Sequence, residues 1–405
     1  MAASTEILEI VASCLCGAHE FKAHVPHAEL PFDVPYCHCN SCRHVTGAMY
    51  SSSVPWRGDG AAIRESSLRR YAFADHLTLF SCRTCSSTMF WEMSARENGT
   101  VSYGALTGVL PNVDVPALVR ITDHIFVGDT LDGGAVPWLA HVNADGHLPR
   151  LWRGHKDQSE RIVLADLLQP SVENTNVDRP DATALAAGEI PVRCHCGGVD
   201  LVLRSPIAEY AAKPRSELPW FVDPTSNKSY GGFDACDSCR LSSGIDVFHW
   251  TFALVRHFAF PHSGKDTQSS SSFPQSSLEL KEALAATERD PRWGTLTFYE
   301  SSSGVQRFFC GRCSACAFYA TDDRSEMVDL AIGLLEAQDG SRAEGLISWD
   351  FGGKMVWKQD VRGGWRQDFV ERMENAAERW RAQRGYPKSW LRIRKENAAK
   401  QEGQT

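Results

Sequence analysis

Cysteine spacing constrains this chain more than any other feature of its sequence. Thirteen of the fourteen cysteines fall into one pattern that occurs twice. The pattern is a Cys-x-Cys-Gly block, then a block that ends in Cys-x-x-Cys-Arg, then a second Cys-x-x-Cys preceded by Phe. Three blocks that keep their order predict an internal duplication. The second copy has longer stretches between its blocks.

The two copies differ at one cysteine. Asp234 stands in the second copy where the first copy has Cys37. The blocks of the first copy are Cys14 to Gly17, Cys37 to Arg43 and Phe80 to Cys85. The blocks of the second copy are Cys194 to Gly197, Asp234 to Arg240 and Phe308 to Cys313.

The chemistry expected of these cysteines depends on the compartment. The first residues show no basic patch followed by an apolar core, and no stretch approaches the roughly 18 to 20 apolar residues of a membrane span. We therefore expect a soluble protein of a reducing compartment without a membrane partner, cytoplasmic or alternatively nuclear. There, closely spaced cysteine pairs are read as metal ligands before disulfides. A disulfide framework is the alternative, although a chain of 405 residues can bury cores without such links.

Composition gives little support for nucleic acid as a partner. The net charge is −8 and the pI is about 6.0, so no general attraction to nucleic acid is expected. Residues 366–400 nevertheless carry ten Lys and Arg against five Asp and Glu. Val370, Met373, Ala377 and Trp380 recur there at helical spacing, which predicts an amphipathic helix packed on the body. A surface for acidic partners is the alternative.

Composition also suggests the domain boundaries. Residues 169–189 are rich in Pro, Asn, Asp, Ala and Thr without periodicity, which is typical of a linker. We expect a first zinc domain at 1–168, a second and partly degenerate one at 190–365, and a basic C-terminal helix and tail at 366–405. The serine-rich residues 262–277 predict a surface loop, followed by a short helix near 278–287.

The expected fold is mainly β. Short apolar, aromatic or β-branched runs are bounded by turn residues and read as strands. The runs are Ile7–Val11, Met49–Val54, Leu77–Phe80, Met89–Met93, Val101–Ala105, Val199–Leu203, Phe248–Leu254, Leu296–Tyr299 and Ala317–Ala320.

Ligand counting divides the seven cysteines of the first copy into four and three. A closed structural zinc takes four ligands, whereas a catalytic zinc keeps three protein ligands and an open position. The pairs Cys14/Cys16 and Cys82/Cys85 come from distant parts of the chain and can close a four-thiolate site. Cys37, Cys39 and Cys42 lie too close in sequence to enclose a metal, which leaves an open face.

These blocks resemble the family of glutathione-dependent formaldehyde-activating enzymes, which includes centromere protein V. The resemblance covers about residues 5–140 and 188–335. It implies two tandem domains of the β-tent type, each with a structural zinc. The implied structural ligands are Cys14, Cys16, Cys82 and Cys85, repeated as Cys194, Cys196, Cys310 and Cys313.

The resemblance also implies a second zinc, at which glutathione and formaldehyde combine to S-(hydroxymethyl)glutathione. Its ligands in the first copy are Cys37, Cys39 and Cys42. In the second copy Asp234, Cys236 and Cys239 either hold a zinc or have lost it, and we expect about three zinc ions per chain.

Three further residues leave alternatives open. Arg43 and Arg240 follow the central blocks. Each either binds a carboxylate of the substrate or neutralises the charge of the zinc-thiolate cluster. For Arg43 the substrate carboxylate would be that of glutathione. Cys316 is either a rival ligand beside Cys313 or a free thiol in the core.

Two function classes follow from the sequence. The first is a carbon-sulfur lyase that acts on a small thiol, an aldehyde or their adduct, with zinc as cofactor and glutathione as co-substrate. The second is a non-catalytic zinc module that binds other proteins, as centromere protein V suggests. The sequence does not indicate an oligomeric state.

Overall fold

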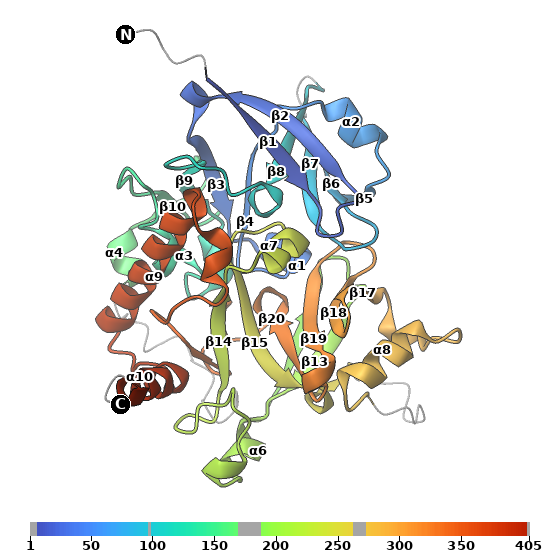
Figure 1. Ribbon diagram of the computed structural model, residues 1–405, viewed down its shortest axis with the longest axis vertical. Coiled ribbons are helices and arrows are strands. Elements are labelled where there is room, and N and C mark those ends of the chain that lie inside the picture. Colours follow the sequence, from blue (N-terminus) through green and yellow to red (C-terminus); the bar gives the residue numbers. More distant parts are fainter. Residues whose placement is uncertain (1–5, 96–98, 169–187, 262–272, 403–405) are drawn as a thin grey trace.

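The computed structural model describes residues 6–95, 99–168, 188–261 and 273–402. Over this part the fold is mainly β, as expected, with several sheets and mostly short helices (Figure 1). We call residues 6–168 the first half and residues 188–402 the second half. No helix of the described part is long and apolar enough to cross a membrane. The expected linker and serine-rich loop fall mostly outside the described residues.

In the first half, a hairpin of β1 and β2 stands beside a nine-stranded sheet. The strands are β1 (Ile7–Ser13), β2 (Glu20–Pro26), β3 (Phe32–Cys37), β4 (Ser51–Pro55), β5 (Arg69–Ala74), β6 (Leu77–Ser81), β7 (Thr88–Ser94), β8 (Val101–Leu106), β9 (Val119–Ile125), β10 (Arg150–Trp152) and β11 (Arg161–Ile162). The helices are α1 (Asn40–Thr46), α2 (Gly60–Glu65), α3 (Val136–Leu139) and α4 (Leu164–Leu168).

In the second half, a three-stranded sheet of β12, β13 and β16 accompanies a seven-stranded one. The strands are β12 (Glu189–Arg193), β13 (Asp200–Arg204), β14 (Ser229–Asp234), β15 (Phe248–Leu254), β16 (Phe258–Ala259), β17 (Leu296–Ser302), β18 (Val305–Cys310), β19 (Cys316–Thr321), β20 (Met327–Ala331) and β21 (Ile347–Trp349). The helices are α6 (Ile207–Ala211), α7 (Asp237–Ser243), α8 (Ser277–Ala285), α9 (Trp365–Gln383) and α10 (Trp390–Glu402).

The two large sheets share one strand order. The order β5-β6-β7-β8-β4-β3-β9 of the first half corresponds to β17-β18-β19-β20-β15-β14-β21 of the second. Each sheet contains one corresponding parallel pair, β3-β9 in the first half and β14-β21 in the second. The register also shifts at corresponding places, after Phe80 in β6 and after Phe308 in β18. This agreement of topology supports the internal duplication that the cysteine pattern predicts.

The halves contact each other through reciprocal turns. The amide of Gly108 in the turn η2 (Thr107–Val109) donates to the carbonyl of Gly244 at the end of α7. The amide of Gly333 in the turn η9 (Ile332–Leu334) donates to the carbonyl of Gly47 at the end of α1. A Cβ atom on Gly47 would lie 2.2 Å from the carbonyl oxygen of Cys316, so only glycine fits this junction.

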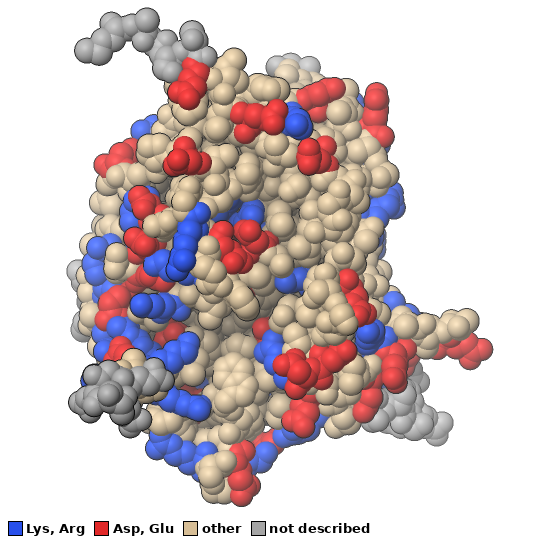
Figure 2. Space-filling view, viewed as in Figure 1, with Lys and Arg blue, Asp and Glu red and all other residues tan. Residues whose placement is uncertain are grey.

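The expected C-terminal helix is present as α9, and Val370, Met373, Ala377 and Trp380 are buried, as predicted. The prediction of a single helix was nevertheless incomplete, because α9 ends at Gln383 and a second helix, α10, follows. Lys and Arg side chains gather over α9 and α10 with acidic side chains among them (Figure 2). Several are paired within these helices, including Arg381 with Glu378.

All the strand runs expected from the sequence are strands here, although their ends move by a few residues. Strands such as β3 and β14 were missed. In β3, Phe32, Val34 and Tyr36 are buried and alternate with Asp33 and Pro35. Pro35 is tolerated because it lies at the register shift against β9, where the regular ladder is interrupted.

Candidate metal centres and the adjoining pocket

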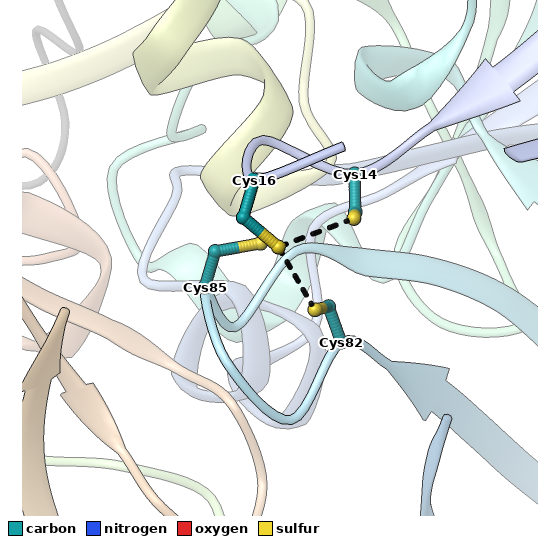
Figure 3. Close-up of side chains that lie close together, drawn as sticks. All are labelled: Cys14, Cys16, Cys82 and Cys85. Atoms are coloured by element: carbon teal, nitrogen blue, oxygen red, sulfur yellow. Dashed lines mark hydrogen bonds between the residues drawn. The ribbon is translucent and has the colours of Figure 1, made fainter. Parts of the chain in front are cut away.

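Four thiols of the first half lie together (Figure 3). Cys14 and Cys16 sit in the turn after β1, and Cys82 and Cys85 sit in the turn after β6. The Sγ atom of Cys16 lies 3.6 Å from that of Cys14 and 3.6 Å from that of Cys82. Three of the four cysteines are buried. The predicted pairs therefore meet, and they join the hairpin of β1 and β2 to the large sheet.

The second half repeats this group with Cys194, Cys196, Cys310 and Cys313. The Sγ atom of Cys196 lies 3.6 Å from that of Cys194 and 3.4 Å from that of Cys310. Thiolates bound to tetrahedral zinc at about 2.3 Å are about 3.8 Å apart. Sulfur spacing and ligand type therefore both fit Zn²⁺ in the two groups. All fourteen cysteines are free thiols, which does not support the disulfide alternative.

Cys37, Cys39 and Cys42 form a third group, where β3 ends and α1 begins. Cys39 is the N-cap of α1, and its sulfur accepts a hydrogen bond from the amide of Cys42 at 3.2 Å. All three cysteines are only partly buried, and no fourth ligating side chain of the described residues joins them. Hydrogen bonds from Cys37 and Cys42 lower the pKa of Cys39. The donor set fits zinc with one position left open.

The corresponding group of the second half is Asp234, Cys236 and Cys239. The carboxylate of Asp234 accepts from the amide of Cys236 at 2.8 Å and from the thiol of Cys239 at 3.4 Å. Burial, followed by the charge of Cys236, raises the pKa of Asp234 to about 7. The guanidinium of Arg307 lies 3.6 Å from the sulfur of Cys239. The corresponding residue of β6 is Leu79, so the first group has no arginine at this position.

Arg43 and Arg240 hold corresponding positions in α1 and α7, but their contacts differ. The Nη1 atom of Arg240 donates to the carbonyls of Gly108 and Leu110 across the junction. Arg43 is 4% exposed and donates through Nη2 to Asn40 at 2.7 Å. Its Nε and Nη1 atoms have no hydrogen-bond partner among the described residues. A buried cation with free donors is costly unless it meets an anion.

A cavity of about 260 Å³ adjoins Arg43. Asn40, Arg43 and His44 line it from α1, and Asp129 to Leu131 line it from the turn η3 (Val127–Thr130). Its other wall is the loop 335–341 of the second half. Cys39 directly precedes Asn40, so α1 links the partly exposed thiols to this pocket.

Two histidines beside the cysteines are already engaged. The Nε2 atom of buried His38 lies 2.9 Å from Nδ1 of His124. The Nδ1 atom of His195 lies 2.6 Å from the hydroxyl of Tyr71 in the other half. Cys316 is buried and lies outside all four groups, which favours a free core thiol over a rival ligand. Burial raises its pKa to about 12.

Comparison with known protein families gives a match within the first half of the chain. Residues 9–129 match the model of the glutathione-dependent formaldehyde-activating enzyme family. This segment therefore carries a domain of that family, and it contains Cys14, Cys16, Cys82 and Cys85 as well as the partly exposed three-cysteine group. Searches of curated proteins and of solved structures found no match.

Sequence reasoning missed several residues of this region. Asp129 accepts from the amide of Asn40 at 3.3 Å, and no motif marks it. The wall from Leu335 to Ser341 lies far from α1 in sequence. Arg307 could have been noticed, because aligning Phe80 with Phe308 places an arginine opposite Leu79.

Proposed function

We propose that this protein is a zinc-dependent enzyme that makes or breaks the carbon-sulfur bond of a glutathione adduct, in the manner of S-(hydroxymethyl)glutathione synthase. One observation carries the proposal: a partly exposed three-thiol group is separate from the four-thiol groups, and it lies at the start of the helix whose Arg43 lines a pocket and has unpartnered donors. The family match of residues 9–129 supports it.

In the net reaction, the thiol sulfur forms a bond to the carbonyl carbon of formaldehyde, and the π bond to oxygen breaks. The proton of the thiol ends on that oxygen, so nothing is oxidised or reduced. A zinc ion held by Cys37, Cys39 and Cys42 supplies an open position, lowers the pKa of a substrate thiol and carries no redox chemistry of its own.

The chain's own residues bind and orient the substrate. The Nε and Nη1 atoms of Arg43, which are buried and have no acceptor among the described residues, would donate to a carboxylate, and Asn40 fixes the guanidinium through Nη2. Asp129 holds the start of α1 in place through the amide of Asn40. Because Cys39 is the N-cap of the same helix, the thiol group and the carboxylate receptor share one rigid element.

The four-thiol groups have a structural role in this proposal. Each joins a small sheet to the large sheet of its half, and a closed group leaves no position for a substrate. In tandem β-tent domains, Cys14, Cys16, Cys82 and Cys85 would hold one zinc, and Cys194, Cys196, Cys310 and Cys313 another. The Asp234 group departs from the all-thiolate pattern and is proposed to be empty, which makes three zinc ions per chain.

The test is the rate of exchange between free and adduct-bound formaldehyde in the presence of glutathione, followed by NMR. Wild-type protein should accelerate exchange above the uncatalysed rate. Cys39→Ser should return it to that rate, because the open group loses a ligand. The matched control is Cys316→Ala, which removes a buried thiol outside the four groups. If Cys39→Ser exchanges as fast as wild type, the assigned centre is wrong.

The protein-binding alternative has lost part of its support. Arg366 is fully buried and pairs with Asp246 at 2.8 Å, and other basic residues of α9 and α10 pair with acidic neighbours. Deleting residues 366–405 would remove part of the core, so it would not test a surface. Charge reversal of exposed Arg394 and Lys395 tests this alternative instead: unchanged partner capture would count against it.

A further inference from the structure

The pocket beside Arg43 has walls from both halves. Its second-half wall is the loop that contains Ala337 and Ser341. This loop is fixed on the first half, because the amide of Ser341 donates to the carbonyl of Thr130 at 3.0 Å and its hydroxyl donates to Asp132 at 3.0 Å. The amide of Arg342 donates to the same carboxylate at 2.7 Å. The first half alone would leave this side open.

The corresponding place beside Arg240 is occupied by the chain itself. The turn η10 (Lys358–Val361) corresponds to η3, since Asp360 accepts from the amide of Asp237 at 3.1 Å as Asp129 does from Asn40. After η10 the chain runs into α9 against the first-half loop that contains Asn112. The side chain of Asn112 donates to the carbonyl of Val361 at 2.8 Å and accepts from the amide of Arg366 at 3.1 Å.

Arg240 consequently has acceptors for its hydrogen-bond donors, whereas Nε and Nη1 of Arg43 have none among the described residues. The Nη1 atom of Arg240 donates to the carbonyls of Gly108 and Leu110. Val361, at the end of η10, is fully buried. The two halves thus share a topology, but among the described residues Arg43 lines a pocket while Arg240 is bound by backbone carbonyls of the other half. That pocket has one wall from α1, the helix that Cys39 caps, and another wall from the second half.

We infer that the second half acts as the far wall of the substrate pocket, so that Arg43 binds the carboxylate of the thiol and the loop 335–341 selects thiols long enough to cross from α1 to Ala337. This inference rests on the proposed function. It gives the half with the altered metal group a part in substrate choice. A peptide thiol such as glutathione has the required length and charge, whereas a small neutral thiol meets neither requirement.

The experiment compares two neighbouring substitutions in the full-length, zinc-loaded chain. Ala337→Trp places an indole in the pocket, whereas Gln338→Trp places the same group on an exposed residue that does not line it. Glutathione binding is measured by calorimetry, and formaldehyde exchange by NMR. We expect Ala337→Trp to raise the Kd for glutathione about tenfold or more, which corresponds to about 1.4 kcal/mol. Gln338→Trp should change it less than about twofold.

A second variant, Ala337→Glu, keeps the test valid if the indole disturbs folding, because a new carboxylate near Arg43 competes with an anionic thiol. Zinc content and melting temperature verify that each variant is folded. Normal glutathione affinity in both Ala337 variants, together with wild-type exchange, would overturn the inference. If wild-type protein neither binds glutathione nor accelerates exchange, the proposed function fails instead, and this inference with it.

Discussion

Replacing Arg43 by Gln tests the substrate-binding role that the structure gives to this residue. Arg43 is buried, and its Nε and Nη1 atoms have no partner among the described residues. A hydrogen bond to a charged group contributes about 1.5 to 3 kcal/mol. Losing two such bonds to a carboxylate, partly replaced by one amide, should cost about 3 kcal/mol, or about a hundredfold in kcat/KM.

The assay is formaldehyde exchange with glutathione as the thiol, repeated with 2-mercaptoethanol, which has no carboxylate. Arg43→Gln should slow the glutathione reaction by the stated factor and leave the 2-mercaptoethanol reaction nearly unchanged. Zinc content should stay at the wild-type value, because no ligand is altered.

Arg240→Gln is the matched control from the other half. Arg240 donates to the carbonyls of Gly108 and Leu110, so its loss should lower the free energy of unfolding by about 1 to 3 kcal/mol. It should affect the glutathione and 2-mercaptoethanol reactions equally. The reasoning is refuted if Arg43→Gln slows both thiols alike, or if Arg240→Gln reproduces the glutathione-specific loss.

Three further changes test the scaffold. Cys82→Ser should remove one zinc and unfold the first half, because structural zinc binding contributes directly to folding; unchanged near-UV circular dichroism would contradict this. Asp246→Asn leaves Arg366 buried without its counter-ion and should cost about 3 to 5 kcal/mol in denaturant titrations, whereas replacing both residues by Met should recover most of the loss. The hydrogen bond from Arg381 lowers the pKa of Glu378 to about 2 from 4.5, so its stabilising effect is present above pH 4.5 and lost as the pH falls toward 2. Glu378→Gln should flatten that part of the stability profile, and an unchanged profile would refute the assignment.

The cysteine groups could be predicted from the sequence because ligand pairs are local. A Cys-x-Cys or Cys-x-x-Cys pair occupies one turn, so the pairs Cys14/Cys16 and Cys82/Cys85 are evident from the sequence. Only the contact between the two pairs had to be inferred. The three-cysteine group is equally local, but its shape was not foreseen. Cys42 lies within α1, so the group spans the end of a strand and the start of a helix.

The pocket could not be predicted in this way, since it depends on contacts between distant parts of the chain. Nothing near Arg43 in sequence indicates that Ala337 lines the same pocket, or that the start of α9 binds Asn112 of the first half. Strands such as β14 were missed for a related reason. Gly231 and Gly232 lower its strand propensity, and pairing with β15 and β21 on both sides outweighs that local preference.

The central claim is that the three-cysteine group of the first half holds an open zinc and the corresponding Asp234 group does not. The most direct measurement is zinc per chain, by elemental mass spectrometry on protein purified without chelator or added metal, for wild type and for Cys39→Ser. The account predicts about three zinc ions for wild type and about two for the variant. About two in both proteins would contradict it, because only the four-thiol groups would then hold metal.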